Sequence, residues 1–275
     1  MQRLFSEATD NLVLLDDTTR IDPANEGKLL FFDGWARVGD EPSDSLYGVG
    51  GHYLAVRRDV RYFQWVEHQE REEYRDADGA RVKARIYYSY TREWGKDPVN
   101  SDQFHASAAV SRKNFVLVSV RSSSTAYSRR AHITCYELHH ELIDSAVAQP
   151  ADSLAFALSS DTFQRALDST TRHGAVTCHL IDNTLYYGND PDYPQVGDVR
   201  VTFTLTPECH AWVMAQAHGS EVRPFKSSKD YWVTFCRFSC HQIDPENELS
   251  DEAHAQNILL WVLRVLGVDC GCAWH

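Results

Sequence analysis

Histidine, cysteine and glutamate side chains can bind metals and transfer protons, and this 275-residue sequence groups them in three places. The groups are Glu137 with His139, His140 and Glu141; Cys236 with Cys240 and His241; and Cys270 with Cys272 and His275. None has the two compact pairs that usually form a structural zinc site. Adjacent histidines on a helix would point about 100° apart, which fits a solvated surface. We therefore predict no metal ligands and no cofactor.

Paired carboxylates are a second source of chemistry, and Glu67, Glu70, Glu72 and Glu73 form such a cluster. A charge run on a strand is usually a solvated face, and no buried partner can be assigned to it. The sequence has no G-x-S-x-G, P-loop or G-x-G-x-x-G motif. The glycines at 48, 50 and 51 precede a predicted strand rather than a helix, so they cannot form the usual phosphate cradle. We predict no catalytic residue.

Composition restricts the class of protein. The formal net charge is −12 and the basic residues are scattered, which disfavours nucleic-acid binding. Seven irregularly spaced cysteines favour buried free thiols, with one or two disulfides left open. The longest apolar run, 258–268, is interrupted by Arg264 and is shorter than the ~20 residues of a membrane span.

Alternating apolar residues predict a strand-rich chain. The predicted strands are 28–32, 52–57, 60–67, 81–90, 115–121, 175–181, 184–187, 199–206, 211–217 and 231–238. Turns are predicted at 33–34, 78–79 and 182–183, with a further short charged turn between 57 and 60. The strands at 199–206 and 211–217 are predicted to form a pair. Helices are predicted near 152–171 and over 250–266. The fold class is α+β and β-rich, with mostly antiparallel sheets and two or three helices.

Large side chains occupy both faces of the predicted strand at 60–67. Tyr62 and Gln64 alternate with Arg61, Phe63 and Trp65, so both faces are expected to be covered. The favoured interpretation is a structural core in which arginine stacks on tryptophan. An aromatic patch that faces a partner is the alternative.

Ordered motifs along residues 24–266 resemble the LUMA (transmembrane protein 43) family. They are N-E-G-K-L at 25–29, R-x-V-x-Y-F-Q-W-x-E at 58–67, Y-S-Y with Trp94, G-D-V-R-V-x-F at 197–203, and W-V-L-R at 261–264. The motif residues are Glu26, Gly27, Arg58, Tyr62, Gln64, Trp65, Glu67, Tyr88, Tyr90, Trp94, Gly197, Asp198, Arg200, Trp261 and Arg264. The family has no established catalytic residues, so we expect these side chains to be structural.

The resemblance implies a non-catalytic scaffold or interaction domain in the lumen of the endoplasmic reticulum and inner nuclear membrane. It implies partners among the membrane proteins of those compartments, self-association, and membrane spans in sequence that flanks this chain. The implied organisation is a lead-in at 1–23, a β-rich lumenal domain at 24–247, an amphipathic membrane-proximal helix at 248–268 and a tail at 269–275.

Two other classes stay open at this point. A hydrolase or metal-dependent enzyme would bring the histidine, cysteine and glutamate groups together in one cleft. A small-ligand or lipid-binding module would place an apolar cavity near the membrane-proximal helix.

Overall fold

A computed structural model describes residues 7–75, 82–118, 123–147, 176–226, 234–239, 241–242 and 244–245. Its strands are β1 (Leu12–Leu14), β2 (Leu29–Arg37), β3 (Ala55–Arg75), β4 (Val82–Gly95), β5 (Ser124–Tyr127), β6 (His132–Ile133), β7 (Tyr136–Leu138), β8 (Cys178–Ile181), β9 (Thr184–Tyr187), β10 (Val199–Thr206), β11 (Cys209–His218), β12 (Glu221–Arg223), β13 (Phe225–Lys226), β14 (Thr234–Phe235) and β15 (Arg237–Ser239). The helices are α2 (Ala106–Ser111) and α3 (His140–Val147), with short 3-10 turns η1 (Pro23–Asn25) and η2 (Ser101–Gln103). The predicted β-rich α+β class is confirmed.

One sheet closes into a small barrel. Its strands follow the order β1-β2-β6-β7-β12-β11-β15, and β2 also pairs with β11, so β2, β6, β7, β12 and β11 form a ring. The β2–β11 pairing is antiparallel over eight residues and joins parts of the chain that are far apart in sequence. Closure leaves few free strand edges in this part of the molecule.

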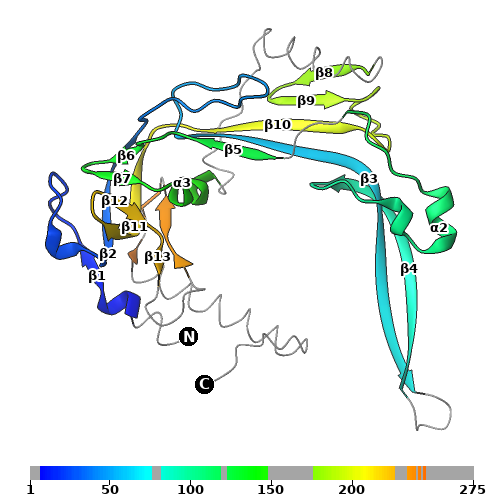
Figure 1. The fold of residues 1–275 in the computed structure, drawn as a ribbon, viewed down its shortest axis with the longest axis horizontal. Coiled ribbons are helices and arrows are strands. Elements are labelled where there is room, and N and C mark those ends of the chain that lie inside the picture. The colour runs from blue at the N-terminus through cyan, green and yellow to red at the C-terminus, as the bar shows by residue number, and fades with distance from the viewer. Residues whose placement is uncertain are drawn as a thin grey trace.

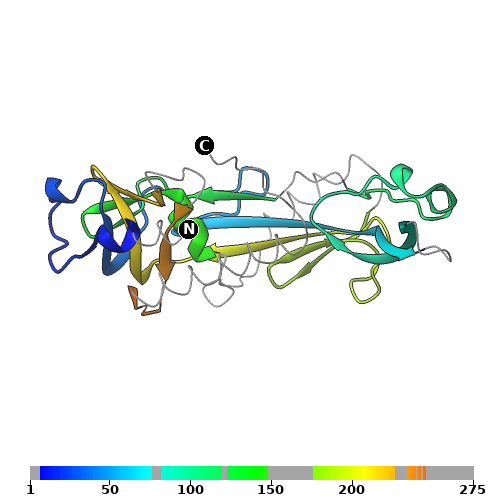
Figure 2. The ribbon, with the colours of Figure 1, turned by 90° about the horizontal axis from the view of Figure 1, so that it is seen from below.

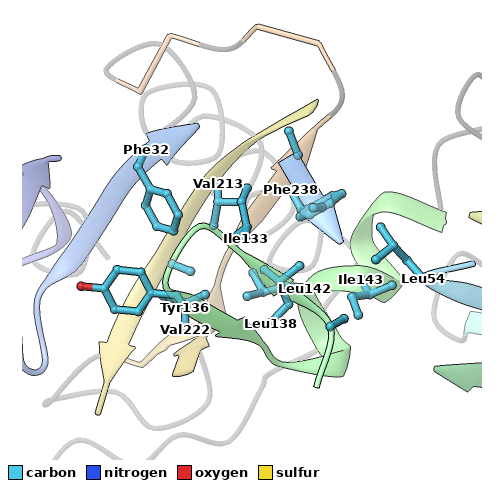
Figure 3. Packing of buried hydrophobic residues seen from close by; sticks show 14 of the residues in the cluster. Phe32, Leu54, Ile133, Tyr136, Leu138, Leu142, Ile143, Val213, Val222 and Phe238 are labelled. Atoms are coloured by element: carbon cyan, nitrogen blue, oxygen red, sulfur yellow. The ribbon is translucent and has the colours of Figure 1, made fainter. Parts of the chain in front are cut away.

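The barrel encloses the larger hydrophobic core. Figure 3 shows the side chains that meet there from β2, β6, β7, β11, β12 and β15, with Leu142 and Ile143 of α3 beside them. Phe32, Ile133 and Val213 are buried, and the rings of Phe32 and Tyr136 lie 5.5 Å apart. Alternate residues of each short strand therefore point inward, as a small barrel requires.

A second sheet follows the order β4-β3-β10-β9-β8, and β5 also pairs with β3. Its core lies on one face of the antiparallel β3–β10 pair, where Val60, Tyr62, Val201 and Phe203 are buried. The loop that carries Tyr47 packs on the same face. Helix α3 contacts β3 and β10 of this sheet and β15 of the barrel sheet, so it packs against both sheets.

Strands β3 and β4 continue past this sheet as a long two-stranded ribbon. Figure 1 shows β3 running across the upper part of the molecule below β8, β9 and β10 and then turning downward with β4, far from the barrel. Figure 2 shows that the whole molecule is elongated and thin in the perpendicular view. We call residues 66–75 of β3 and 82–91 of β4 the arm.

Two predicted turns are wrong. The Asp33-Gly34 pair lies inside β2, where Asp33 pairs with Trp212 and Gly34 with Ala211. Glycine is needed there for packing, because a Cβ at Gly34 would lie 2.6 Å from the Thr134 side chain. The predicted break at 57–60 is also strand, since β10 pairs continuously with residues 55–62.

Two predicted strands also differ from the structure. Residues 115–118 form no strand, and 119–122 are outside the described residues. The strand predicted at 231–238 is interrupted at Cys236, between β14 and β15. Strands β10 and β11 do not pair with each other, because one joins the β3 sheet and the other the barrel.

The hairpins signalled by turn residues are confirmed. Strands β8 and β9 pair antiparallel around Asp182-Asn183, and Asp182 has a φ of 49°, as such a tight turn requires. The β3–β4 hairpin is present, although its tip lies outside the described residues. The helices predicted at 152–171 and 248–268, the 269–275 tail, Trp261 and Arg264 also lie outside them. Within the described part of the chain, no helix is long and apolar enough to cross a membrane.

Candidate functional site at the root of the arm

Most of the motif residues meet where β3 leaves β10 and becomes the arm. This region, which we call the arm root, consists of Tyr62, Gln64, Trp65, Glu67, Tyr90, Trp94, Asp198 and Arg200. Residues that are well over 100 positions apart in sequence are brought together because β3 pairs with β10 on one side and β4 on the other. The sequence prediction that these side chains are structural can therefore be examined contact by contact.

The end of the β3–β10 pairing is held by Gly197 and Asp198. The Phe63 N–H donates to the Asp198 carbonyl at 2.9 Å, and the Gly197 N–H donates to the Phe63 carbonyl at 2.9 Å. Gly197 has a φ of 102°, and a Cβ there would lie 2.4 Å from the Phe115 ring. Two residues of one strand thus face one residue of the other, which is a bulge that redirects β3.

The Asp198 carboxylate is buried, and one of its oxygens accepts two hydrogen bonds. It accepts hydrogen bonds from the Tyr186 hydroxyl at 2.5 Å and from the Gln195 N–H at 2.8 Å. Burial, followed by the bond to Asp198, raises the pKa of Tyr186. The tyrosine therefore stays neutral and donates a proton to this bond, which fixes the loop before β10.

Gln64 holds the chain that follows β4. Its Nε2 donates to the Asp97 carbonyl and its Oε1 accepts from the Val99 N–H, both at 2.8 Å. The side chain is only 3% exposed. It passes so close to Gly95 that a Cβ there would lie 2.3 Å from its Nε2.

Asn114 caps the edge of β3 just beyond the bulge. The Trp65 N–H donates to its Oδ1 at 2.8 Å, and its Nδ2 donates to the Trp65 carbonyl at 2.9 Å. One amide side chain thus replaces a paired strand for one residue. Sequence reasoning missed Asn114, because nothing in its local sequence signals a contact 49 residues away.

Arginines stack on the aromatic rings of the arm root. Arg92 and Arg112 lie 5.5 and 5.6 Å from the centre of the Trp65 ring, and Arg112 lies 4.5 Å from that of Tyr90. Arg200 lies 4.4 Å from the Trp94 ring. The predicted stacking of arginine on tryptophan is confirmed, although Trp65 and Trp94 are half-buried rather than enclosed in a core.

Glu67 connects the start of the arm to the segment before α2. It accepts hydrogen bonds from the Tyr90 hydroxyl at 2.8 Å and the His105 N–H at 2.6 Å. The rings of Tyr88 and His105 lie 4.5 Å apart. The prediction of a solvated acidic face is therefore wrong for Glu67, whereas Glu70, Glu72 and Glu73 are exposed.

Three motif residues lie elsewhere and have local structural contacts. Arg58 is buried and forms an ion pair with Asp44. Glu26 accepts from the Gly219 N–H at 2.8 Å, and Gly27, with a φ of 76°, donates to the Ala217 carbonyl at 3.0 Å. The last two contacts join the start of β2 to the β11–β12 turn.

Beyond the arm root, both strand edges of the ribbon are unpaired among the described strands. The backbone of Phe63 and Trp65 points away from β4, as their bonds to Asp198 and Asn114 show. By strand alternation, Glu67, Gln69, Arg71 and Glu73 also direct their N–H and C=O groups outward. Each strand of the arm is therefore an edge strand, a template for pairing with another chain.

The arm also exposes large apolar surface. Tyr74, Ile86, Tyr87 and Tyr88 are between 36% and 44% exposed. Their polar contacts stay within the ribbon: the Tyr87 hydroxyl donates to Glu72 at 2.9 Å. An isolated two-stranded ribbon is at best marginally stable in water, so the arm depends on its root or on a partner.

The prediction that the side chains of His139 and His140 point about 100° apart is wrong. His139 precedes α3 and His140 begins it, so their rings lie 4.2 Å apart, and His139, His140 and Glu141 bring ligand atoms within 4.8 Å of one another. Glu137 lies on β7 instead. Burial and the neighbouring His140 lower the pKa of His139, which favours its neutral, metal-binding form. Two imidazoles and a carboxylate can bind a divalent metal, although His140 and Glu141 are exposed.

Among the cysteines of the described ranges, Cys135, Cys178 and Cys236 are free thiols. Burial raises the pKa of Cys178 and of Cys236 to about 11. Such thiols are protonated near neutral pH and poorly reactive. Cys240, Cys270, Cys272 and His275 lie outside the described residues.

A closed barrel joined to a β-ribbon defines the class: a β-rich domain whose described motif residues contact other parts of the same fold. The transmembrane protein 43 family profile matches residues 62–270, and the chain belongs to that family. It is 27% identical to transmembrane protein 43 of Pongo abelii and of Homo sapiens, and 29% identical to that of Mus musculus, over 273 residues each. The alignments cover 96% of this chain and 63% of each relative. No solved structure matches.

Proposed function

We propose that this chain is a non-catalytic scaffold and interaction domain of a membrane protein, and that the arm is its contact element. The proposed setting is the lumen of the endoplasmic reticulum and the inner nuclear membrane, where the domain would organise the nuclear envelope together with other membrane proteins. Family membership supports the membrane setting, since the relatives are named transmembrane proteins. The observation that carries the interaction role is the projecting ribbon with two unpaired edges.

The arm residues favour pairing with a second copy of this chain. Residues 66–75 carry four glutamates and two arginines, for a net charge of −2, whereas 82–95 carry one lysine, two arginines and one glutamate, for +2. Two β3 edges, or two β4 edges, would repel each other. The β3 edge of one copy and the β4 edge of another are complementary in charge, so the predicted contact is heterologous and extends the ribbon.

Charge reversal tests this pairing on the 275-residue chain. Glu70→Lys with Glu73→Lys makes the β3 edge basic, and Lys83→Glu with Arg85→Glu makes the β4 edge acidic. Each variant alone is expected to lose concentration-dependent association in sedimentation velocity, and a mixture of the two is expected to associate again. Association of the wild type should weaken as salt is added.

The matched control reverses two exposed carboxylates away from the arm, Asp16→Lys with Asp192→Lys, and should associate as the wild type does. A wild type that stays monomeric at every concentration would contradict the proposed self-association. So would variants that associate separately but gain nothing from mixing.

A further inference from the structure

A cluster of cations lies on the face of the β3–β10 pair opposite the buried core. Arg57, Arg61, Lys96 and Arg200 line a cavity of about 510 Å³, and Asp59 is the one carboxylate among its lining residues. The cluster therefore has a net charge of +3, in a chain whose formal net charge is −12. Such a local excess of positive charge within an acidic chain requires a specific explanation.

The strand register places these side chains on one face. Arg57 is opposite Thr204, Asp59 is opposite Thr202, and Arg61 is opposite Arg200. The odd-numbered residues of β3 point into the cavity, while Val56, Val60 and Tyr62 point into the core on the other side. The arrangement is thus set by the backbone of two paired strands and not by flexible loops.

Internal partners leave most of this charge uncompensated. Asp59 accepts from Arg61 Nε at 2.8 Å, but Arg57, Lys96 and Arg200 form no ion pair with any carboxylate in the described ranges. Two arginines directly opposite on paired strands repel each other. Burial, followed by the charge of Arg61, lowers the pKa of Arg200. Arg200 is held in place by stacking on Trp94.

We propose that this basic cavity binds a phosphate-bearing ligand, either a lipid headgroup or a soluble phosphate compound. Guanidinium groups form paired hydrogen bonds with phosphate oxygens, and a doubly charged phosphate would offset most of the +3 charge. The Thr204 hydroxyl also lines the cavity and can donate to a phosphate oxygen, whereas the Thr202 hydroxyl is hydrogen-bonded to that of Thr184 at 2.9 Å. The inference does not depend on self-association of the arm, which involves other residues.

The test uses the 275-residue chain with inorganic pyrophosphate in calorimetry, and with phosphatidylcholine vesicles containing or lacking phosphatidic acid in flotation. The variant is Arg57→Gln with Lys96→Gln, because neither side chain has an ion pair whose loss would disturb the fold. We expect the wild type to bind pyrophosphate, the phosphatidic acid vesicles or both, and the variant to bind about tenfold or more weakly. Thermal unfolding should show that the variant is folded.

Arg20→Gln with Arg130→Gln removes the same charge at two exposed sites that do not line the cavity, and should leave binding unchanged. Binding of pyrophosphate alone assigns the site to a soluble phosphate, and retention only by phosphatidic acid vesicles assigns it to a headgroup. The proposal is overturned if neither probe binds, if the cavity variant binds as tightly as the wild type, or if the control loses as much affinity as that variant. A monomeric chain that binds phosphate would refute the proposed self-association and keep this inference.

Discussion

The barrel and the arm differ in whether the edges of their strands are paired. In the barrel, the β2–β11 pairing closes five strands around buried side chains such as Phe32 and Ile133. In the arm, two strands pair only with each other and expose tyrosines on the surface. Hydrophobic burial stabilises the first region, whereas the second is held at its root by specific polar contacts. The same chain therefore contains a closed barrel and a strand pair whose outer edges have no neighbour among the described strands.

The largest predicted difference between the barrel and the arm is the loss in free energy of unfolding when an aromatic ring is removed. Phe32→Ala should lower the free energy of unfolding by about 3–5 kcal/mol, because it leaves a cavity in the barrel core. Tyr87→Ala in the arm should change it by about 0.5 kcal/mol or less, since the ring is 44% exposed. Chemical denaturation of both variants measures the contrast. Equal losses would show that the arm is part of the cooperative core.

Alkaline pH should destabilise the part of the fold outside the arm, because the buried Tyr47 and the half-buried Tyr127 lose their protons there. Burial raises the pKa of Tyr47 to about 12, and that of Tyr127 to about 12 through burial and a bond to Asp144. A raised pKa means that the folded state keeps its proton, so this stability is intact below pH ~10 and is lost as pH rises toward 12. The buried Tyr47 contributes a slope of about 1.4 kcal/mol per pH unit in that window, and the half-buried Tyr127 contributes less because solvent screens its charge. Tyr47→Phe should reduce the measured slope by about that amount, and an unchanged slope would contradict the assignment.

A smaller effect is predicted for the cap on the β3 edge. Asn114→Ala removes both hydrogen bonds to Trp65 and should cost about 1–3 kcal/mol. The loss should be local, so amide hydrogen exchange is expected to accelerate at Trp65 and along the arm but not at Val213 in the barrel. Unchanged protection at Trp65 would mean that the cap does not hold the arm.

Local sequence patterns predicted the longer strands, but not β5, β6, β7 or β12 and not how the barrel closes. Alternation at 199–206 and the Asp182-Asn183 turn correspond to β10 and the β8–β9 hairpin. Closure of the barrel could not be predicted, because β2 and β11 are far apart in sequence and Asp33-Gly34 resembles a turn. The charged residues at 57–60 resemble a loop in the sequence. In the fold, Arg58 is buried in an ion pair with Asp44, and this contact could not be predicted from the sequence.

The sequence indicated the motif residues and the stacking of arginine on tryptophan, which the structure confirms. It did not predict that residues 58–67 and 197–203 would meet at one place. Asn114 and the cation cluster at Arg57 and Lys96 were missed, since single polar residues carry no periodic signal. The unpaired edges of the arm could not be predicted either, because the alternating pattern indicates that a strand forms but not which strands pair with it.

The most direct test of the open-edge account is a pair of neighbouring proline substitutions in β3. The Gln69 N–H points outward, so Gln69→Pro should block pairing with another chain while leaving the hairpin in place. The His68 N–H points toward β4, so His68→Pro should disrupt the hairpin itself. The measurement is sedimentation velocity of both variants beside the wild type, with hydrogen exchange of β4 as the check on the hairpin. The account predicts that Gln69→Pro abolishes association and keeps β4 protected, and association of Gln69→Pro equal to that of the wild type would contradict it.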